Sequence, residues 1–349
     1  IVVLENFAAT LSEAIDRTAV QHVMLASMGD LLGFWYGRWI TFAVRHLAKM
    51  VPAYKLALQG PHGRRTIVDF RTALAEGERL RMQPAQTDGQ SVAFLQYTGG
   101  TTGLSKGAIL THRNIVAAIL QAEAWFSPAV AKAGDLRKIN AITALPLYHI
   151  FALTLGLLAI RWGAHMTLVP NPRDVDRFVD TLRQRPFHLL PAVNTLFNAL
   201  LQHPRFRQVD FSSLVLSQAG GMAASEGTAR QWLAVTGCPM VEGWGMSETC
   251  AIGTNNPVTA TEFSGTIGLP LPGIDIAIKD EEGVSLPLGE TGEICIRGPN
   301  VMAGYHNQPD ESAAAFTADG FMRTGDIGVM DAQGYTRIVD RKKDMILVS

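Results

Sequence analysis

The sequence has few cysteines and no excess of charge of either sign. Its three cysteines, Cys238, Cys250 and Cys295, form neither a C-x-x-C pair nor an even set. This spacing disfavours a zinc site and a disulfide framework, and it indicates free thiols in a reducing cytosol. The 30 basic and 31 acidic residues leave a formal net charge of −1. Because nucleic-acid-binding domains usually carry a clear basic excess, nucleic acid is disfavoured as the main partner.

The chain also lacks an initiator methionine, a basic leader and an unbroken hydrophobic span. It opens with IVVLENFAAT, so we expect it to begin inside a domain. Residues 139–160 contain no formally charged side chain and are long enough to cross a bilayer. However, Asn140 lies near the start of this span, and Pro146 and His149 interrupt its middle. We therefore predict a buried strand over 139–145, a polar turn and an apolar helix in place of a membrane span.

What is present is an alternation of strand-like and helix-like segments. Short apolar runs bounded by breakers predict strands at 22–27, 91–97, 165–170, 187–193, 213–219 and 239–245. Apolar residues three and four positions apart predict helices that begin after the capping residues Thr111, Asn171, Asn194 and Ser225. The alternation predicts an α/β fold of mixed, mostly parallel sheets flanked by helices. In such sheets, ligands collect beyond the carboxyl ends of the strands.

The alternation of strand-like and helix-like segments ends near Gly268. Residues 274–299 alternate short strand-like runs with the turns EEG and GETG, which predicts a smaller β-rich subdomain. We accordingly divide the chain into α/β layers over 1–267, a β-rich subdomain over 268–342, and the start of a further element at 343–349.

The segment YTGGTTGLSKG, residues 97–107, is typical of a loop that grips phosphate. Its glycines permit a close backbone approach, its threonines offer hydroxyls and Lys106 offers a charge. A P-loop NTPase needs G-x-x-x-x-G-K-[ST] leading directly into a helix, whereas Leu104 and Ser105 here separate Gly103 from the lysine. Because the following GAIL favours a strand, we predict a strand–loop–strand grip on a polyphosphate tail.

This loop resembles the phosphate loop of the adenylate-forming enzymes, the family of acyl-CoA synthetases, luciferases and peptide-synthetase adenylation domains. Most members have Ser in place of Gly100 and Pro in place of Ser105. Six further segments match family motifs in order: LPLYHIF, QAGGM, EGWGMSET, GEICIRGPNVMAGY, RTGDIG and DRKKDMI. The resemblance covers residues 91–349, and the motif sequences are most similar to those of the bacterial long-chain fatty-acid–CoA ligases. It implies a large N-terminal adenylation domain, cut at both ends, without the small C-terminal domain of the family.

The resemblance implies a reaction in two halves. A carboxylate attacks the α-phosphate of ATP in the presence of Mg²⁺, which gives acyl-AMP and pyrophosphate; the thiol of CoA then displaces AMP and leaves a thioester. The first half requires positive charge and metal around the developing phosphate charge. A fatty acid is the implied substrate. The implied phosphate contacts come from Thr98, Gly99, Thr101, Thr102, Gly103 and Lys106.

Further residues take implied roles around the adenylate. Glu248 is the candidate for holding Mg²⁺, with help from the Thr101 hydroxyl, because Mg²⁺ prefers oxygen ligands. Trp244 stands where the family usually has Tyr, and its flat ring would stack on adenine. Ser247 would bond the α-phosphate, and Gly221 would leave room for the base. The other implied nucleotide contacts are Gly245 and Met246 beside the tryptophan, and Asp326 and Arg341 at the ribose.

The resemblance also implies roles outside the nucleotide contacts. His149 would lie near the reacting carboxylate, and Phe151, Val193 and Phe197 would line an acyl tunnel. By composition alone, the histidine would be a hydrogen-bonded core residue and the three apolar side chains plain core. Lys343 matches the family's hinge, about which the small C-terminal domain swings between the two half-reactions.

Several alternatives stay open. The acid could be medium-chain or aryl, because the shared motifs read ATP and not the acid; a non-catalytic nucleotide- or lipid-binding homologue is another alternative. Residues 31–68 hold six basic and no acidic side chains, with Trp35, Tyr36, Trp39 and Phe42 among the first of them. This pattern indicates either peripheral contact with an anionic membrane or a helix packed on its own domain. We expect a cytoplasmic protein, with contact to the inner membrane face and homodimer formation left open.

Overall fold

The computed structural model describes residues 1–98 and 105–341, with side chains up to Asp340. The chain divides into two compact units, Ile1–Gln86 and Thr87–Ser349. The first holds a small parallel sheet, and the second holds the large sheet that carries the predicted site.

The first unit is built on three parallel strands paired in the order β1-β2-β5. Its strands are β1 (Val2–Leu4), β2 (His22–Ala26), β3 (Gln59–Gly60), β4 (Gly63–Arg64) and β5 (Thr66–Asp69), and its α-helices are α1 (Ala8–Ala14), α2 (Phe34–Phe42) and α3 (Phe70–Gly77). Buried Arg65 ties these pieces together, because its guanidinium donates to the Asp16 carboxylate at 2.6 Å and to the carbonyl of Ile15 at 2.9 Å. Strand β2 confirms the strand predicted at 22–27.

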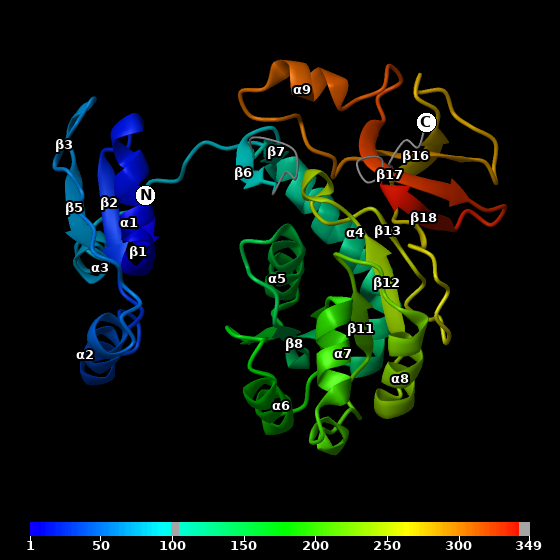
Figure 1. The fold of residues 1–349 in the computed structure, drawn as a ribbon, viewed down its shortest axis with the longest axis horizontal. Coiled ribbons are helices and arrows are strands. Elements are labelled where there is room, and N and C mark those ends of the chain that lie inside the picture. Colours follow the sequence, from blue (N-terminus) through cyan, green and yellow to red (C-terminus); the bar gives the residue numbers. More distant parts are fainter. Residues whose placement is uncertain (99–104, 342–349) are drawn as a thin grey trace, which may run out of the picture. The chain divides into compact units, whose positions relative to one another are not determined.

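The second unit contains a seven-stranded sheet in the order β14-β13-β12-β11-β10-β8-β9. Figure 1 labels β8, β11, β12 and β13 of this sheet. The five strands from β12 to β9 run parallel, whereas β13 and β14 are antiparallel to their neighbours. The strands are β8 (Asn140–Thr143), β9 (His165–Leu168), β10 (Leu189–Ala192), β11 (Leu216–Ala219), β12 (Met240–Trp244), β13 (Thr254–Asn255) and β14 (Leu269–Pro270). The mostly parallel α/β sheet expected from the alternation is confirmed.

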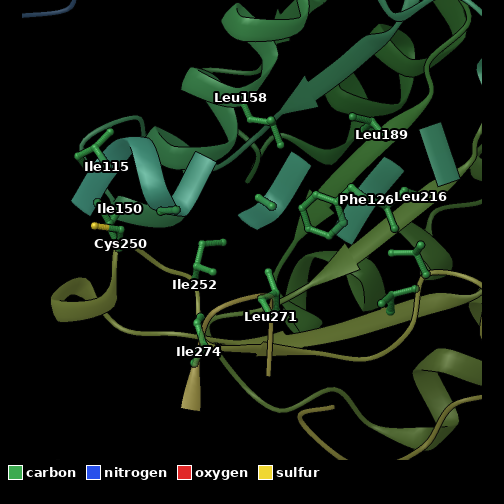
Figure 2. Packing of buried hydrophobic residues seen from close by; sticks show 14 of the residues in the cluster. Ile115, Phe126, Ile150, Leu158, Leu189, Leu216, Cys250, Ile252, Leu271 and Ile274 are labelled. Carbon is green, nitrogen blue, oxygen red and sulfur yellow. The ribbon is translucent and has the colours of Figure 1, made fainter. Parts of the chain in front are cut away.

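Helices cover both faces of this sheet. They are α4 (His112–Val130), α5 (Ile150–Trp162), α6 (Val175–Gln184), α7 (Asn194–Gln202) and α8 (Glu226–Thr236). Successive side chains of a strand point to opposite faces. Leu189 of β10 therefore joins Phe126 and Leu158 in one core (Figure 2). Its neighbour Leu190 joins the core on the other face. Helices α4 and α5 therefore lie on the first face, and α6, α7 and α8 on the second (Figure 1).

Two of the four predicted helix caps are correct. Thr111 and Asn114 form a reciprocal capping box at the start of α4, and Ser225 caps α8. The Asn171 cap is wrong, because α6 begins at Val175 and the side chain of Asp174 accepts the hydrogen bond from Arg177 N. The Asn194 cap is also wrong. Asn194 is the first helical residue of α7, and its side-chain oxygen instead accepts from Ser225 N at 3.2 Å.

The uncharged span 139–160 is folded as expected, as the short strand β8, a turn and the start of α5. Across residues 1–98 and 105–341, no helix combines the length and the apolar character needed to cross a membrane.

Two smaller antiparallel assemblies complete the second unit. Strands β6 (Val92–Tyr97) and β7 (Gly107–Thr111) form a hairpin in which Tyr97 faces Gly107, so the predicted phosphate loop does join two strands. A four-stranded sheet follows in the order β15-β16-β17-β18. Its strands are β15 (Asp275–Lys279), β16 (Thr291–Arg297), β17 (Met322–Met330) and β18 (Thr336–Arg341), and α9 (Pro309–Ala314) lies between the second and third of them in sequence.

Candidate active site

A cleft with a volume of about 700 Å³ opens at the carboxyl ends of β11 and β12 in the second unit. The segments 220–224 and 242–248, which follow or end these strands, line it. Thr98 beside the phosphate loop, His149 at the start of α5 and Asp326 of β17 also line it. Ligands of parallel α/β sheets bind in this place, since the loops that leave neighbouring strands meet there.

The loop after β11 is held in a fixed shape at the floor of the cleft. Gly221 has a φ of +77°, which favours glycine, and a Cβ on Gly220 would lie 3.2 Å from the ring of Phe151. Two side chains anchor the loop's far end. Glu242 Oε1 accepts a 3.0 Å hydrogen bond from Ala224 N, while Asn194 accepts from the next residue. The chain thus presents backbone, without side-chain bulk, to the cleft at Gly220 and Gly221.

Glu242 is a site residue that the sequence interpretation missed. It lies in β12, is buried, and lines the cleft. Burial raises the pKa of this carboxyl, and the hydrogen bond from Ala224 N opposes that rise. The signal in the sequence is an acidic residue inside the apolar strand PMVEGWG. A carboxyl is costly to bury in a strand without a partner, so its position pointed to a polar site.

The end of β12 brings together two residues predicted to bind the nucleotide. Trp244 is partly buried, and its indole Nε1 donates a 2.8 Å hydrogen bond to Asp326 Oδ2. Gly245 follows, and a Cβ there would lie 2.3 Å from the backbone of Ala251. Only glycine fits at this turn. The indole and a buried carboxylate therefore lie side by side in one wall of the cleft.

The turn after β12 carries Ser247 and Glu248 into the cleft, next to Met246. Glu248 is buried, and its Oε1 accepts a 2.9 Å hydrogen bond from the hydroxyl of Tyr305. Burial, and then the negative charge of Glu248, raise the pKa of Tyr305, so the phenol stays a hydrogen-bond donor.

Lys106 extends the pair formed by Glu248 and Tyr305. Its ammonium is 5.3 Å from the centroid of the Tyr305 ring and is paired with the carboxylate of Glu311 on α9. Lys106 is not among the described residues that line the cleft, but Tyr305 connects it to Glu248. The predicted phosphate lysine and the predicted metal carboxylate are therefore brought into one connected group.

The other predicted residues are placed as follows. His149 is exposed at the start of α5, where its Nδ1 accepts a 3.3 Å hydrogen bond from Phe151 N. Phe151 lines the cleft, and Val193 packs below Gly221. Phe197 is fully buried against the ring of Trp232, with centroids 4.7 Å apart, and does not line the described part of the cleft. Outside the described part of the chain lie Gly99, Thr101, Thr102, Gly103, Lys343 and the side chain of Arg341.

The residues present fit a magnesium ion that is bound mainly through phosphate. Within the described ranges 1–98 and 105–341, no three His, Cys, Asp or Glu side chains gather as a protein metal cage. Mg²⁺ usually retains water and takes one or two carboxylates together with substrate phosphates. The buried carboxylate of Glu248, in the wall of the cleft, is a ligand of that kind.

A second, smaller cavity of about 30 Å³ lies below α5. Its wall is mostly apolar and includes Leu158 and Trp162 of the helix. The cavity shares Phe126, Leu155 and Gln218 with the wall of the large cleft, so the two spaces adjoin at these side chains.

Comparisons with known proteins agree with this geometry. The profile of the AMP-binding enzyme family matches residues 43–306, and the chain belongs to this family. A long-chain-fatty-acid–CoA ligase of Escherichia coli O6:H1 is 44% identical over 350 residues, which cover 100% of this chain and 60% of that protein. The chain therefore spans 60% of the length of this relative.

Solved structures show the same similarity. The crystal structure of ATP-bound MatB from Rhodopseudomonas palustris has a TM-score of 0.72 and 29% identity, and the match covers 94% of this chain and 60% of that one. A malonyl-CoA ligase in a ternary product complex with methylmalonyl-CoA and AMP has a TM-score of 0.67 and 27% identity, over 96% of this chain and 64% of that one.

Proposed function

We propose that the chain is the nucleotide- and acid-binding part of a long-chain fatty-acid–CoA ligase that works through acyl-AMP. The observation that carries this proposal is the cleft whose wall holds Trp244, Glu248 and Asp326 together, with a mostly apolar cavity next to it. In the first half-reaction, a carboxylate oxygen bonds to the α-phosphorus of ATP and the bond to pyrophosphate breaks. In the second, the sulfur of CoA bonds to the acyl carbon and AMP leaves.

Different residues of the cleft bind different parts of the nucleotide. The ring of Trp244 stacks on adenine, with the glycine backbone at Gly221 below it. Asp326 accepts from the ribose hydroxyls, and Arg341 assists it. Ser247 donates to the α-phosphate. The positive charge of Lys106, with Thr98, Gly99, Thr101, Thr102 and Gly103, stabilises the β- and γ-phosphates that depart as pyrophosphate.

Different residues would hold the metal and the acid. Glu248 and Thr101 would hold Mg²⁺, whose charge would help to neutralise the developing phosphate charge. His149 orients the acid carboxylate at the start of α5. The acyl chain extends past Phe151 toward the apolar cavity below that helix. Lys343 serves as the hinge for the domain exchange between the half-reactions.

Acid-dependent exchange between ATP and labelled pyrophosphate tests this proposal. A series of saturated acids from short to long, together with an aryl acid, is assayed on the 349-residue chain and on a version extended by the remaining C-terminal part of the Escherichia coli relative. We expect nucleotide binding by the chain alone, weak exchange, and strong exchange with long acids in the extended version. Preference for an aryl or medium-chain acid would show that this acid, and not a long-chain fatty acid, is the substrate. Near-full ligase activity of the chain alone would contradict the proposal that full activity requires the C-terminal part as well.

We also propose that residues 31–68 make peripheral contact with an anionic membrane. The supporting observation is that α2 exposes Trp35, Tyr36 and Trp39, with the exposed side chain of Arg38 among them. An apolar helix face beside positive charge binds to the headgroup region of anionic lipids.

Co-sedimentation with anionic and neutral vesicles tests the membrane contact. Reversal of Arg38 and Lys49 to Glu should abolish binding to anionic vesicles, whereas reversal of Arg71 and Arg81, which are exposed elsewhere in the same unit, should not. Arg45 is left intact because it neutralises buried Glu5. Equal binding by all variants would end this proposal.

A further inference from the structure

Tyr305 lies between the two charged groups that the proposed reaction needs at the phosphates. Its main chain is fixed to the strand that leaves the phosphate loop. Tyr305 pairs with Ala108 across a β-bridge, and His306 N donates to the carbonyl of Gly107 at 2.8 Å. On the other side, Tyr305 N donates to Ser312 Oγ at 2.8 Å. The backbone at this residue is thus held by β7 and by α9.

The side chain of Tyr305 is held just as firmly. Its hydroxyl donates to Glu248 Oε1 at 2.9 Å, and the phenol is partly buried. Met302, three residues earlier, donates its N–H to the carbonyl of Glu248 at 2.7 Å. The short segment 302–305 therefore fixes both the backbone and the carboxylate of Glu248. A hydrogen bond to an ionised acceptor is stronger than a neutral one, so the contact restricts the rotation of the carboxylate.

The face of the same ring carries the lysine. The Lys106 ammonium lies 5.3 Å from the ring centroid, which is within the range of a cation–π contact. One aromatic side chain therefore touches the candidate metal carboxylate with its hydroxyl and the candidate phosphate lysine with its face. No other residue named in this site contacts both groups in the described part of the chain.

We propose that Tyr305 is a positioning residue that presents Glu248 to the magnesium of MgATP and sets the separation between Glu248 and Lys106. This role rests on the proposed function. The hydroxyl acts through Glu248 and the ring acts through Lys106, so the two contributions can be removed separately. Loss of the hydroxyl should weaken only binding that involves the metal, because adenine and ribose contact Trp244 and Asp326.

The test is calorimetric titration of the 349-residue chain and its Tyr305→Phe variant with three ligands: AMP, ATP in a chelator, and ATP with Mg²⁺. We expect the affinities of the variant for AMP and metal-free ATP to stay within about twofold of wild type. Its affinity for MgATP should fall roughly tenfold to a hundredfold, the effect of removing a hydrogen bond to a charged group. Tyr335→Phe, in the turn between β17 and β18, is the matched control and should change none of the three.

A double-mutant cycle separates positioning from general structure. If Tyr305 acts through Glu248, then Tyr305→Phe should cost little further MgATP affinity in a Glu248→Gln background. Equal weakening of all three ligands, unchanged MgATP affinity, or an undiminished effect in that background would each overturn the proposal. A wild-type chain that binds neither AMP nor ATP would refute the proposed function itself, and this inference with it.

Discussion

The indole Nε1 of Trp244 donates a hydrogen bond to Asp326 Oδ2 at 2.8 Å, across 82 positions of sequence. Trp244 ends β12 of the large sheet, and Asp326 belongs to β17 of the four-stranded sheet. The bond therefore joins the two sheets at the wall of the cleft, and it fixes the plane of the indole relative to the carboxylate. Under the proposed function, it sets the angle between the adenine and ribose contacts.

Trp244→Phe should weaken AMP and ATP binding by a similar, modest factor. The variant keeps a flat ring for stacking but removes the N–H that orients Asp326. We expect a loss of about 1 kcal/mol, which is roughly fivefold in affinity, for both nucleotides. Trp244→Ala should cost more, because it also removes the stacking surface. Calorimetric titration with both nucleotides measures this, with Trp35→Phe as a control on exposed α2. A loss confined to ATP would contradict the assignment.

Glu311→Gln should tighten the binding of pyrophosphate and ATP. The Glu311 carboxylate is paired with Lys106, and both side chains are partly exposed. A phosphate must displace this carboxylate and approach against its charge. Because an exposed ion pair is worth less than about 1 kcal/mol, we expect roughly twofold to threefold tighter binding. The gain should shrink as salt is raised, because salt screens the pair.

Asp310→Asn is the control for this effect, since it removes an adjacent charge from the same helix. It should change pyrophosphate affinity less than Glu311→Gln does. Weaker binding in Glu311→Gln, or an equal gain in both variants, would show that Glu311 does not compete for the lysine.

The sequence predicted those parts of the site that follow strand ends. Trp244 and Glu248 lie directly after an apolar run, so strand topology alone brings them to one edge. Tyr305 was missed because its contact with Glu248 depends on the pairing of Ala108 with Tyr305, 197 positions apart, which no local pattern encodes. Glu242 was missed because a single acidic residue in a strand also fits a solvated face.

Side-chain direction on helices was equally hard to predict. Phe197 was assigned to the acyl tunnel, yet its ring packs on Trp232 of α8. An apolar stripe reveals that a helix face is buried but not what lies opposite it. The cap predictions at Asn171 and Asn194 failed for a related reason. Asn is favoured at helix starts, but Asp174 offered a closer cap, and the Asn194 amide bonds the loop after β11 instead.

Lys279→Ala should strongly destabilise the four-stranded sheet. Lys279 is only 1% exposed, and its ammonium donates to the Gly283 carbonyl, Ser285 Oγ and the Asp319 carboxylate. The substitution removes the three hydrogen bonds of a buried ammonium and leaves a void beside Phe321. We expect the free energy of unfolding to fall by about 2 kcal/mol, which denaturant unfolding followed by circular dichroism measures. Lys132→Ala in the second unit should change it little. A loss no larger than that of the control would contradict the assigned role.

The contact between Lys279 and Asp319 makes part of the free energy of unfolding depend on pH. The hydrogen bond from Lys279, and then that from Thr317, lower the pKa of Asp319 from 3.8 to about 2. A carboxyl whose pKa is lower in the folded state stabilises the protein above its ordinary pKa. That stabilisation is lost as the pH falls from about 4 toward 2. Asp319→Asn should therefore be less stable than wild type at pH 6, and the difference should vanish near pH 2. A difference that does not vary with pH would contradict this assignment.

Leu155→Trp should shorten the acids that the protein accepts. Leu155 belongs to the walls of both the cleft and the apolar cavity below α5, so a larger side chain there should fill the apolar space where the two adjoin. In acid-dependent exchange between ATP and pyrophosphate, we expect kcat/KM for a long saturated acid to fall at least about tenfold, the usual cost of overfilling a packed site. The value for a short acid should stay within about twofold, because its carboxylate and first carbons remain in the cleft. Ile160→Trp, which is exposed on the same helix, should alter neither. A uniform fall across chain lengths would show that the acyl chain follows another path.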